Sequence, residues 1–229
     1  DDIIIAVREL LQPKGEALHA VKVKFDGSTF RQEFLDRHFL IRSLVRVCSG
    51  RSRLTRIASS GLKLAADAAT LVVNPGESIQ ATVSRAREGD TVLVMPGLYR
   101  ETVFIDKDRI QLRGVIKEGQ WPVLDGEGTL NDGVLASGHG VVIENLWVRR
   151  YKGNGIMTQG SNNYQIIHNV VEGPCFYAIF PQFGKNGLVA HNFVTKSEDA
   201  AIYVGMSDGV DIISNEASQS IIGIETENS

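Results

Sequence analysis

The sequence contains few cysteines, few aromatic side chains and no long apolar run. Its only cysteines are Cys48 and Cys175, which excludes a disulfide framework. No stretch approaches the about 20 apolar residues that a membrane-spanning helix needs. Eight basic residues and two acids lie between Arg31 and Lys63, but the interleaved aromatic pattern of a nucleic-acid surface is missing, so we expect no nucleic-acid partner.

Charge and glycine are distributed unevenly along the 229 residues. Residues 1–70 hold 12 Lys and Arg against 8 Asp and Glu, whereas residues 71–229 hold 12 against 19. Nineteen of the 23 glycines follow residue 70, as expected of a β protein with many turns. We therefore predict a basic N-terminal segment, residues 1–69, and a core domain, residues 70–229.

The N-terminal segment has weak local patterns. Apolar spacing in "DDIIIAVRELLQ" (1–12) predicts a short amphipathic helix, and "HAVKVKFDGSTFRQEF" (19–34) predicts a strand, a turn at Asp26-Gly27 and a second strand. An Ala-x-Ala arrangement around residues 65–69 is typical of a secretory cleavage site, although Arg42 and Arg46 interrupt the preceding apolar stretch. We interpret the segment as a leader remnant or as a small accessory segment.

A short helix is expected at the start of the core domain. In "NPGE" (74–77), Asn is a good N-cap, Pro suits the first helical position, and Glu three residues after Asn completes a capping box. Ile79, Val83 and Ala86 would share one face, and Gly89 would end the helix in a left-handed conformation. This predicts a capping helix over residues 75–88.

After the helix, the sequence repeats every 23 residues. The blocks 141–163, 164–186 and 187–209 and the incomplete block 210–229 align so that three apolar columns appear. Their members are Ile143, Ile166, Val189 and Ile212; Val148, Val171, Val194 and Ala217; and Ile156, Ile179, Ile202 and, after a one-residue deletion, Ile224. Three short strands per 23-residue coil predict an all-β fold, a right-handed parallel β-helix whose coils stack about 4.8 Å apart.

One polar column is expected to be structural. Leu146, Asn169, Asn192 and Asn215 recur at the turn between two strands. A side-chain amide there can bond to its copies in the neighbouring coils and tolerates left-handed backbone, so we predict an asparagine ladder. The first methionine is Met95 and the last block stops short at Ser229, so we expect the natural chain to continue; that continuation, or another chain, would cover the open end of the solenoid.

The stretch "LVVNPGESIQATVSRAREGDTVLVMPGLYRETVFI" (71–105) and the coils after it resemble the right-handed parallel β-helix, or pectin-lyase-like, superfamily. That superfamily includes pectate and alginate lyases, epimerases, polygalacturonases, viral tailspikes and periplasmic copper-handling accessory proteins of nitrous oxide reductase. The resemblance implies a secreted or periplasmic location and a polysaccharide partner. The calcium-binding acids of pectate lyases and the aspartate set of polygalacturonases have no counterpart in this sequence, which leaves enzymatic activity open.

Columns bring residues of successive coils together, so we looked for sites along them. Met157, Phe180, Tyr203 and Glu225 should project outward from the third strand, unless the loop with Phe176 and Tyr177 covers the rings. Exposed aromatic rings flanked by amides and acids are typical of a sugar-binding groove, because the rings offer faces for stacking and the polar groups bind hydroxyls. The predicted substrate-binding residues are Phe180, Tyr203, Gln159, Gln182, Arg149 and Arg150.

The loop after the second strand varies most between coils, and solenoids often build their sites in such loops. Elimination on a uronic acid needs a cation for the carboxylate and a base for the C5 proton. Lys152, Lys196 and Tyr151 are therefore candidate catalytic residues of a lyase or C5-epimerase, and a solvated charged rim is the alternative. A hydrolase is less favoured, because Glu198 and Asp199 are adjacent and would point apart.

A metal site is the remaining candidate. His168 and His191 should stack directly, and two imidazoles can share copper or zinc. A third ligand is missing from their column. No cofactor is required by the sequence. A divalent metal at His168 and His191 would favour the copper-handling function over the polysaccharide function, and a noncatalytic scaffold is the third possible function.

Overall fold

The computed structural model describes residues 2–7, 19–24, 68–173 and 175–229. Near the N-terminus, β1 (Asp2–Val7) and β2 (His19–Lys24) form an antiparallel pair. The predicted helix over residues 1–12 is therefore wrong, because the β-branched run Ile3–Ile5 favours a strand over a helix. The predicted strand at residues 19–24 is confirmed. The Asp26-Gly27 turn, the strand after it and the leader interpretation lie outside the described residues, and the division at residue 69 stays a prediction.

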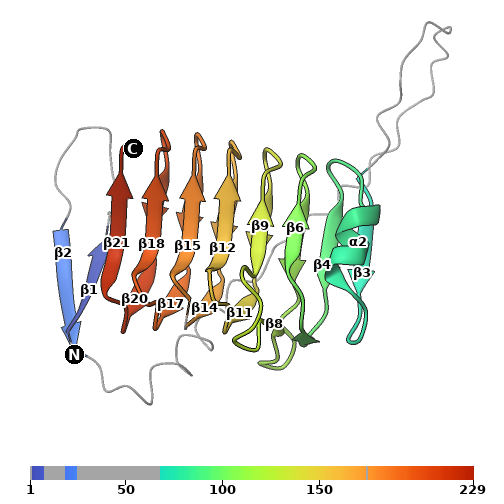
Figure 1. The fold of residues 1–229 in the computed structure, drawn as a ribbon, viewed down its shortest axis with the longest axis horizontal. Coiled ribbons are helices and arrows are strands. Elements are labelled where there is room, and N and C mark those ends of the chain that lie inside the picture. Colours follow the sequence, from blue (N-terminus) through green and yellow to red (C-terminus); the bar gives the residue numbers. More distant parts are fainter. Residues whose placement is uncertain (1, 8–18, 25–67, 174) are drawn as a thin grey trace, which may run out of the picture. The chain divides into compact units, whose positions relative to one another are not determined.

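Residues 70–229 form a parallel β-solenoid with three sheets, as Figure 1 shows for the strands drawn from green to red. In the described range, sheet 1 has seven strands, in the spatial order β19-β16-β13-β10-β7-β4-β3. Their bounds are β3 (Thr70–Val73), β4 (Thr91–Val94), β7 (Gln111–Gly114), β10 (Val142–Glu144), β13 (Gln165–Ile167), β16 (Leu188–Ala190) and β19 (Asp211–Ile213).

Sheets 2 and 3 each have six strands among the described residues. Sheet 2 consists of β5 (Gly97–Tyr99), β8 (Pro122–Asp125), β11 (Trp147–Arg149), β14 (Val170–Glu172), β17 (Phe193–Thr195) and β20 (Glu216–Ser218). Sheet 3 consists of β6 (Val103–Ile105), β9 (Val134–Ala136), β12 (Asn154–Gln159), β15 (Tyr177–Gln182), β18 (Ala200–Gly205) and β21 (Ile222–Glu227). From β4 on, each coil contributes one strand to each sheet, and β3 adds a seventh strand to sheet 1, so the predicted parallel β-helix is confirmed.

The three apolar columns form the core of the solenoid, except in the last coil, where Ile224 of the third column is 44% exposed. Ile143 pairs in register with Ile166, and the register continues to Val189 and Ile212. Ile156, Ile179 and Ile202 are fully buried in the third column. Burial of such aliphatic side chains contributes about 1.5–3 kcal/mol each, and the in-register stacking places residues of neighbouring coils side by side.

The capping helix exists but is shorter at both ends than the predicted range 75–88, and Ala86 in extended conformation ends it, not Gly89. Helix α2 spans Ile79–Arg85, and the Ser78 side chain, not Asn74, caps it by accepting from the Ala81 backbone. The Glu101 carboxylate accepts from the Ile79 and Gln80 backbone N–H groups at 2.8 and 2.9 Å. Because a distant acid supplies the second cap, the local Asn-Pro-Gly-Glu pattern forms only a turn, in which Glu77 accepts from the Asn74 N–H at 2.7 Å. Within the described ranges, no helix has both the length and the hydropathy to cross a bilayer.

The asparagine ladder is confirmed. The Asn169 Oδ1 atom accepts from the Leu146 N–H at 3.1 Å, and the Asn192 Oδ1 atom accepts from the Asn169 N–H at 2.9 Å. Asn215 repeats the contact with Asn192 at 3.0 Å. Asn169 and Asn192 are fully buried, so the ladder satisfies backbone groups that water does not reach.

Candidate functional site

The histidines lie in the turn from sheet 1 to sheet 2, one residue before the ladder. Asn145, His168, His191 and Ser214 have φ values of 58°, 56°, 56° and 50°, so the left-handed backbone falls on this column and not on the ladder asparagines. The imidazole rings of His168 and His191 stack with centroids 5.1 Å apart and planes at 11°. The predicted pairing of the two histidines is confirmed, whereas metal binding by them stays a prediction.

An acid and an arginine of sheet 1 accompany His168. The Glu144 Oε1 atom lies 3.7 Å from His168 Nδ1, and its other oxygen accepts from Arg113. The hydrogen bond from His168, followed by the charges of Arg113 and His168, lowers the pKa of Glu144 against the effect of burial. Glu144 therefore holds a negative charge beside the imidazole pair. Sequence reasoning missed Arg113 and Glu144, because they are 31 residues apart and not 23.

The histidine pair does not form a closed metal site as it lies. Imidazole lone pairs lie in the ring plane, so two nearly parallel rings 5.1 Å apart hold them in separate planes that do not meet at one ion. Among the residues that the structure describes, no group of three or more His, Cys, Asp or Glu side chains could hold a metal ion. Imidazole is a suitable ligand type for copper, but His168 and His191 alone do not fit a complete site in this arrangement.

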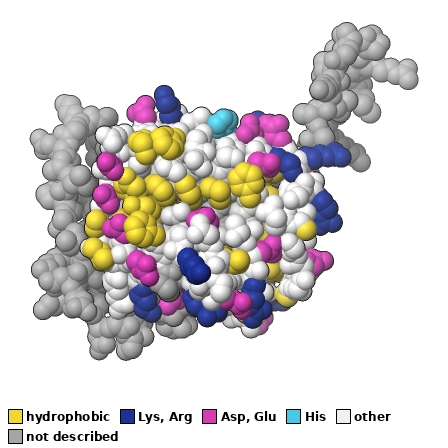
Figure 2. All heavy atoms as spheres, viewed as in Figure 1, with side chains coloured by type: hydrophobic (Ala, Val, Ile, Leu, Met, Phe, Trp, Pro, Cys, Tyr) yellow, Lys and Arg dark blue, Asp and Glu magenta, His cyan; other side chains and the backbone are white. Residues whose placement is uncertain are grey.

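An apolar column runs across the outer face of sheet 3. Register pairs Phe104 with Leu135, Leu135 with Met157, and Met157 with Phe180. The Phe180 and Tyr203 rings stack at 4.9 Å and 17°. We call Phe104, Leu135, Met157, Phe180 and Tyr203 the sheet-3 stripe. Figure 2 shows hydrophobic side chains in a band across these strands, with acidic side chains near its β21 end.

The outward direction predicted for Met157 and Phe180 is confirmed. The alternative, in which the loop with Phe176 and Tyr177 covers the aromatic rings, is confirmed in part. Phe104 is 42% exposed, but Tyr203 is only 8% exposed. The Tyr177 ring lies 4.8 Å from both Phe180 and Tyr203. Gln159 and Gln182 pair in register on the same strands, as predicted, and their role in binding a substrate stays a prediction.

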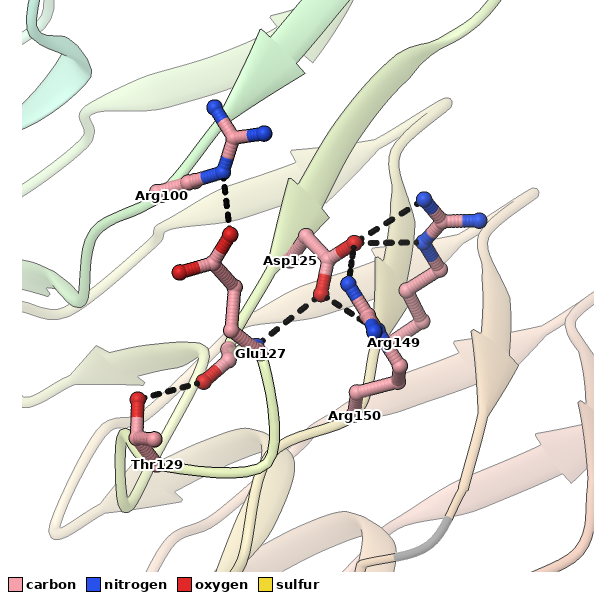
Figure 3. Close-up of polar contacts among 7 residues, drawn as sticks. Arg100, Asp125, Glu127, Thr129, Arg149 and Arg150 are labelled. Atoms are coloured by element: carbon pink, nitrogen blue, oxygen red, sulfur yellow. Dashed lines mark hydrogen bonds and ion pairs between the residues drawn. The ribbon is translucent and has the colours of Figure 1, made fainter.

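Arg149 and Arg150 both contact Asp125 of sheet 2 (Figure 3). The Asp125 side chain is fully buried and accepts from Arg150 Nε at 2.7 Å and from Arg149 Nε at 2.9 Å. Burial by itself raises the pKa of Asp125, but the hydrogen bonds from Arg150 and from the Glu127 backbone, together with the charge of Arg149, outweigh it and lower the pKa. The two predicted substrate-binding arginines thus hold a buried carboxylate.

The three candidate catalytic residues lie in different environments. Tyr151 is 1% exposed and donates its hydroxyl proton to the Glu101 carbonyl at 2.7 Å; burial raises its pKa above the ordinary value. Lys196 Nζ lies 3.2 Å from Glu172 Oε1, whereas Lys152 is exposed. The structure does not bring the three together around one point, and their catalytic roles stay predictions.

Comparisons with known proteins agree with the fold. The family model described as "Periplasmic copper-binding protein (NosD)" matches residues 88–229. No curated protein matches the chain. Among solved structures, Escherichia coli YbhC is 14% identical over 90% of this chain and 69% of its own, with a TM-score of 0.50. A mutant of the periplasmic alginate epimerase AlgG is 12% identical over 61% of this chain and 47% of its own, with a TM-score of 0.35. At these identities the solved structures show the fold alone, and the resemblance to the β-helix superfamily is confirmed.

Proposed function

The chain belongs to the NosD family, and from that premise we propose that it is a periplasmic copper-handling accessory protein of the nitrous oxide reductase type. The single observation that supports this proposal most is the family match, which extends from residue 88 through every later coil of the solenoid. The periplasmic location follows the description of the family. Fractionation of a native host, with the chain recovered in the periplasm, tests that part of the proposal.

The residues proposed to contact copper are His168 and His191. Both lie inside the matched range, their rings are 5.1 Å apart, and the His168 side chain is 33% exposed. Glu144 places a carboxylate beside the pair, which would favour a cation. Since the stacked rings do not converge, the proposed role is transfer, in which the protein that delivers or receives the ion supplies the remaining ligands.

The polysaccharide function has less support. The candidate base Tyr151 is buried and donates to a backbone carbonyl, and Lys196 is paired with Glu172. The faces of the Phe180 and Tyr203 rings lie against each other, whereas a sugar stacks on an open ring face. A lyase or epimerase activity would therefore need residues other than this set.

Copper titration tests the proposal. Cu(I) would be titrated anaerobically into the protein against a chromophoric chelator, and Cu(II) by calorimetry, for wild type, His168→Asn and His191→Asn. Asparagine suits the left-handed backbone, as Asn145 shows at φ 58° in the same column. His139→Asn is the control, because His139 lies outside the pair. We expect either pair variant to lower the affinity by about tenfold or more and the control to match wild type. Equal copper binding by all four proteins, or binding by none, would contradict the proposal.

A further inference from the structure

The sheet-3 stripe has the form of a binding surface. Its five side chains come from five consecutive coils, one from each of β6, β9, β12, β15 and β18. With coils about 4.8 Å apart, the stripe is about 19 Å long. Two further apolar side chains, in the turns after β15 and β18, are exposed: Phe183 at 52% and Met206 at 42%. A continuous apolar band of this kind on a protein surface commonly marks an interaction site.

The stripe is not required by the core of the solenoid. The core side of sheet 3 is filled by Ile105, Ile156, Ile179 and Ile202, each fully buried. Met157 and Phe180 alternate with these residues and face away from them. Polar side chains at the outward positions would leave the core unchanged, so folding does not explain the apolar column.

Acidic side chains lie near each end of the stripe. Asp106 follows Phe104 by two residues and is exposed. At the other end, Glu225 pairs in register with Tyr203, and Glu227 accepts from the Tyr203 hydroxyl. Burial, and after it the negative charges of Asp199, Glu225 and Glu227, raise the pKa of the Tyr177 hydroxyl. The β21 end of the stripe is therefore acidic; at the β6 end Asp106 is exposed, and the neighbouring Lys107 donates to the Val83 and Ser84 carbonyls of helix α2.

These features select among possible occupants. A second copy laid on the stripe in either direction would bring carboxylates against carboxylates, which is unfavourable. A sugar would need open ring faces, and Phe180 and Tyr203 cover each other. A peptide with an apolar face and basic residues near its ends matches both the apolar band and the acidic side chains at the ends of the stripe. Methionine and aromatic side chains also adapt well to helical partners.

We propose that the sheet-3 stripe is a docking surface for a basic amphipathic helix of another protein. A helix rises about 1.5 Å per residue, so about 13 residues span the stripe and present apolar side chains at i, i+3 or i+4, and i+7. Lysine or arginine at its ends lies near Asp106 at one end and near Glu225 and Glu227 at the other. The docking surface does not depend on copper binding.

Sheet 2 provides an internal control. Its outward column contains Leu98, Val123 and Trp147 in register, but arginines accompany it: the Arg149 guanidinium lies 5.7 Å from the centre of the Trp147 ring. Leu98 is 41% exposed and Phe104 is 42% exposed. A basic helix should therefore select the stripe and not the sheet-2 column.

The test uses a fluorescein-labelled amphipathic helical peptide of leucine and lysine, about 13 residues long, and a scrambled peptide of the same composition. Fluorescence anisotropy would be measured with wild type, Phe104→Asp, Met157→Asp and the control Leu98→Asp, each checked for a cooperative thermal transition. We expect both stripe variants to bind the helical peptide about tenfold more weakly than wild type, which corresponds to about 1.4 kcal/mol. We expect Leu98→Asp to bind as wild type does, and the scrambled peptide to bind weakly to every protein.

The acidic β21 end is tested separately. Glu225→Lys should weaken binding of the helical peptide at low salt, and most of this effect should disappear at high salt. Glu118→Lys, in an exposed turn of another coil, should leave binding unchanged at either salt concentration. Equal binding by wild type and the stripe variants, or loss in Leu98→Asp alone, would overturn the proposal. Self-association of wild type that Phe104→Asp abolishes would assign the stripe to a second copy, and saturable binding of alginate or pectin oligomers that the variant loses would assign it to a glycan.

Discussion

Replacement of Asn192 by leucine tests the asparagine ladder. The Asn192 Nδ2 atom donates to the Ile166 carbonyl at 2.8 Å and to Asn215 Oδ1 at 2.9 Å. Its Oδ1 atom accepts from the Asn169 backbone at 2.9 Å and from Asn169 Nδ2 at 3.1 Å. Leucine is similar in size but makes none of these bonds, so the Asn169 N–H and the Ile166 carbonyl would lose their side-chain partner in a buried turn.

The expected cost follows from the groups left without a partner. A buried donor or acceptor without a hydrogen bond costs about 1–3 kcal/mol, so two such groups cost about 2–6 kcal/mol. Leu146 occupies the same column without this cost, because the equivalent residue of the preceding coil, Val115, donates its N–H to the Val94 carbonyl at 2.8 Å. We therefore expect Asn192→Leu to lower the free energy of unfolding by about 3 kcal/mol, which is about 6–12 °C in Tm for a domain of this size.

Urea denaturation followed by circular dichroism, together with thermal melting, measures this loss. Asn131→Leu is the matched control, because Asn131 is exposed and its side chain donates to the neighbouring Asp132 carboxylate; a change within about 0.5 kcal/mol is expected there. A loss below about 1 kcal/mol in Asn192→Leu, or an equal loss in both variants, would refute the reasoning that the ladder stabilises the coils.

Three further predictions concern single side chains. Asp125→Asn should destabilise the fold by about 2 kcal/mol, less than the about 3–5 kcal/mol of a fully buried pair, because Arg149 and Arg150 are partly exposed. Since the fold lowers the pKa of Asp125, wild type has this stabilisation above the unfolded pKa of about 3.9 and loses it as the pH falls through the folded pKa. Urea titrations in which the stability difference between wild type and Asp125→Asn does not shrink below about pH 4 would contradict this. The hydrogen bond to Glu227 and burial raise the pKa of Tyr203 to about 12. Glu227→Gln should therefore lower the Tyr203 pKa toward the ordinary value of 10.0 in a tyrosine NMR titration, and an unchanged pKa would contradict the hydrogen bond between Tyr203 and Glu227. His191→Val should lower the free energy of unfolding, measured by thermal melting, by about 1–2 kcal/mol, because a β-branched residue disfavours φ 56°. His191→Asn should leave the stability nearly unchanged, and equal melting temperatures of the two variants would contradict this explanation.

Residues 141–229 show how far repetition predicts structure. Their coils repeat every 23 residues, except that β21 pairs with β18 at a spacing of 22, so alignment with one deletion predicts which side chains become neighbours. The stacking of His168 on His191 and the bonds of Asn169 with Asn192 follow directly. Such contacts were predictable because a parallel register conserves the spacing from coil to coil.

The remaining contacts depend on coils of unequal length or on distant partners. Arg113 and Glu144 are 31 residues apart, and Arg150 and Asp125 are 25 apart, so neither pair appears in a 23-residue alignment. The start of helix α2 depends on Glu101, more than twenty residues later, which the local capping pattern at Asn74 could not reveal. The sequence predicted the aromatic column and its outward direction, but it did not predict that the faces of the Phe180 and Tyr203 rings would stack on each other.

Copper coordination tests the central claim most directly. X-ray absorption of the copper-loaded protein at the copper edge distinguishes imidazole from other ligands by its multiple-scattering pattern. We predict imidazole scattering in wild type and in His139→Asn, and its loss in a His168→Asn, His191→Asn double variant loaded under the same conditions. Copper bound without imidazole ligands, or an identical spectrum in the double variant, would contradict the assignment of copper handling to the stacked histidine pair.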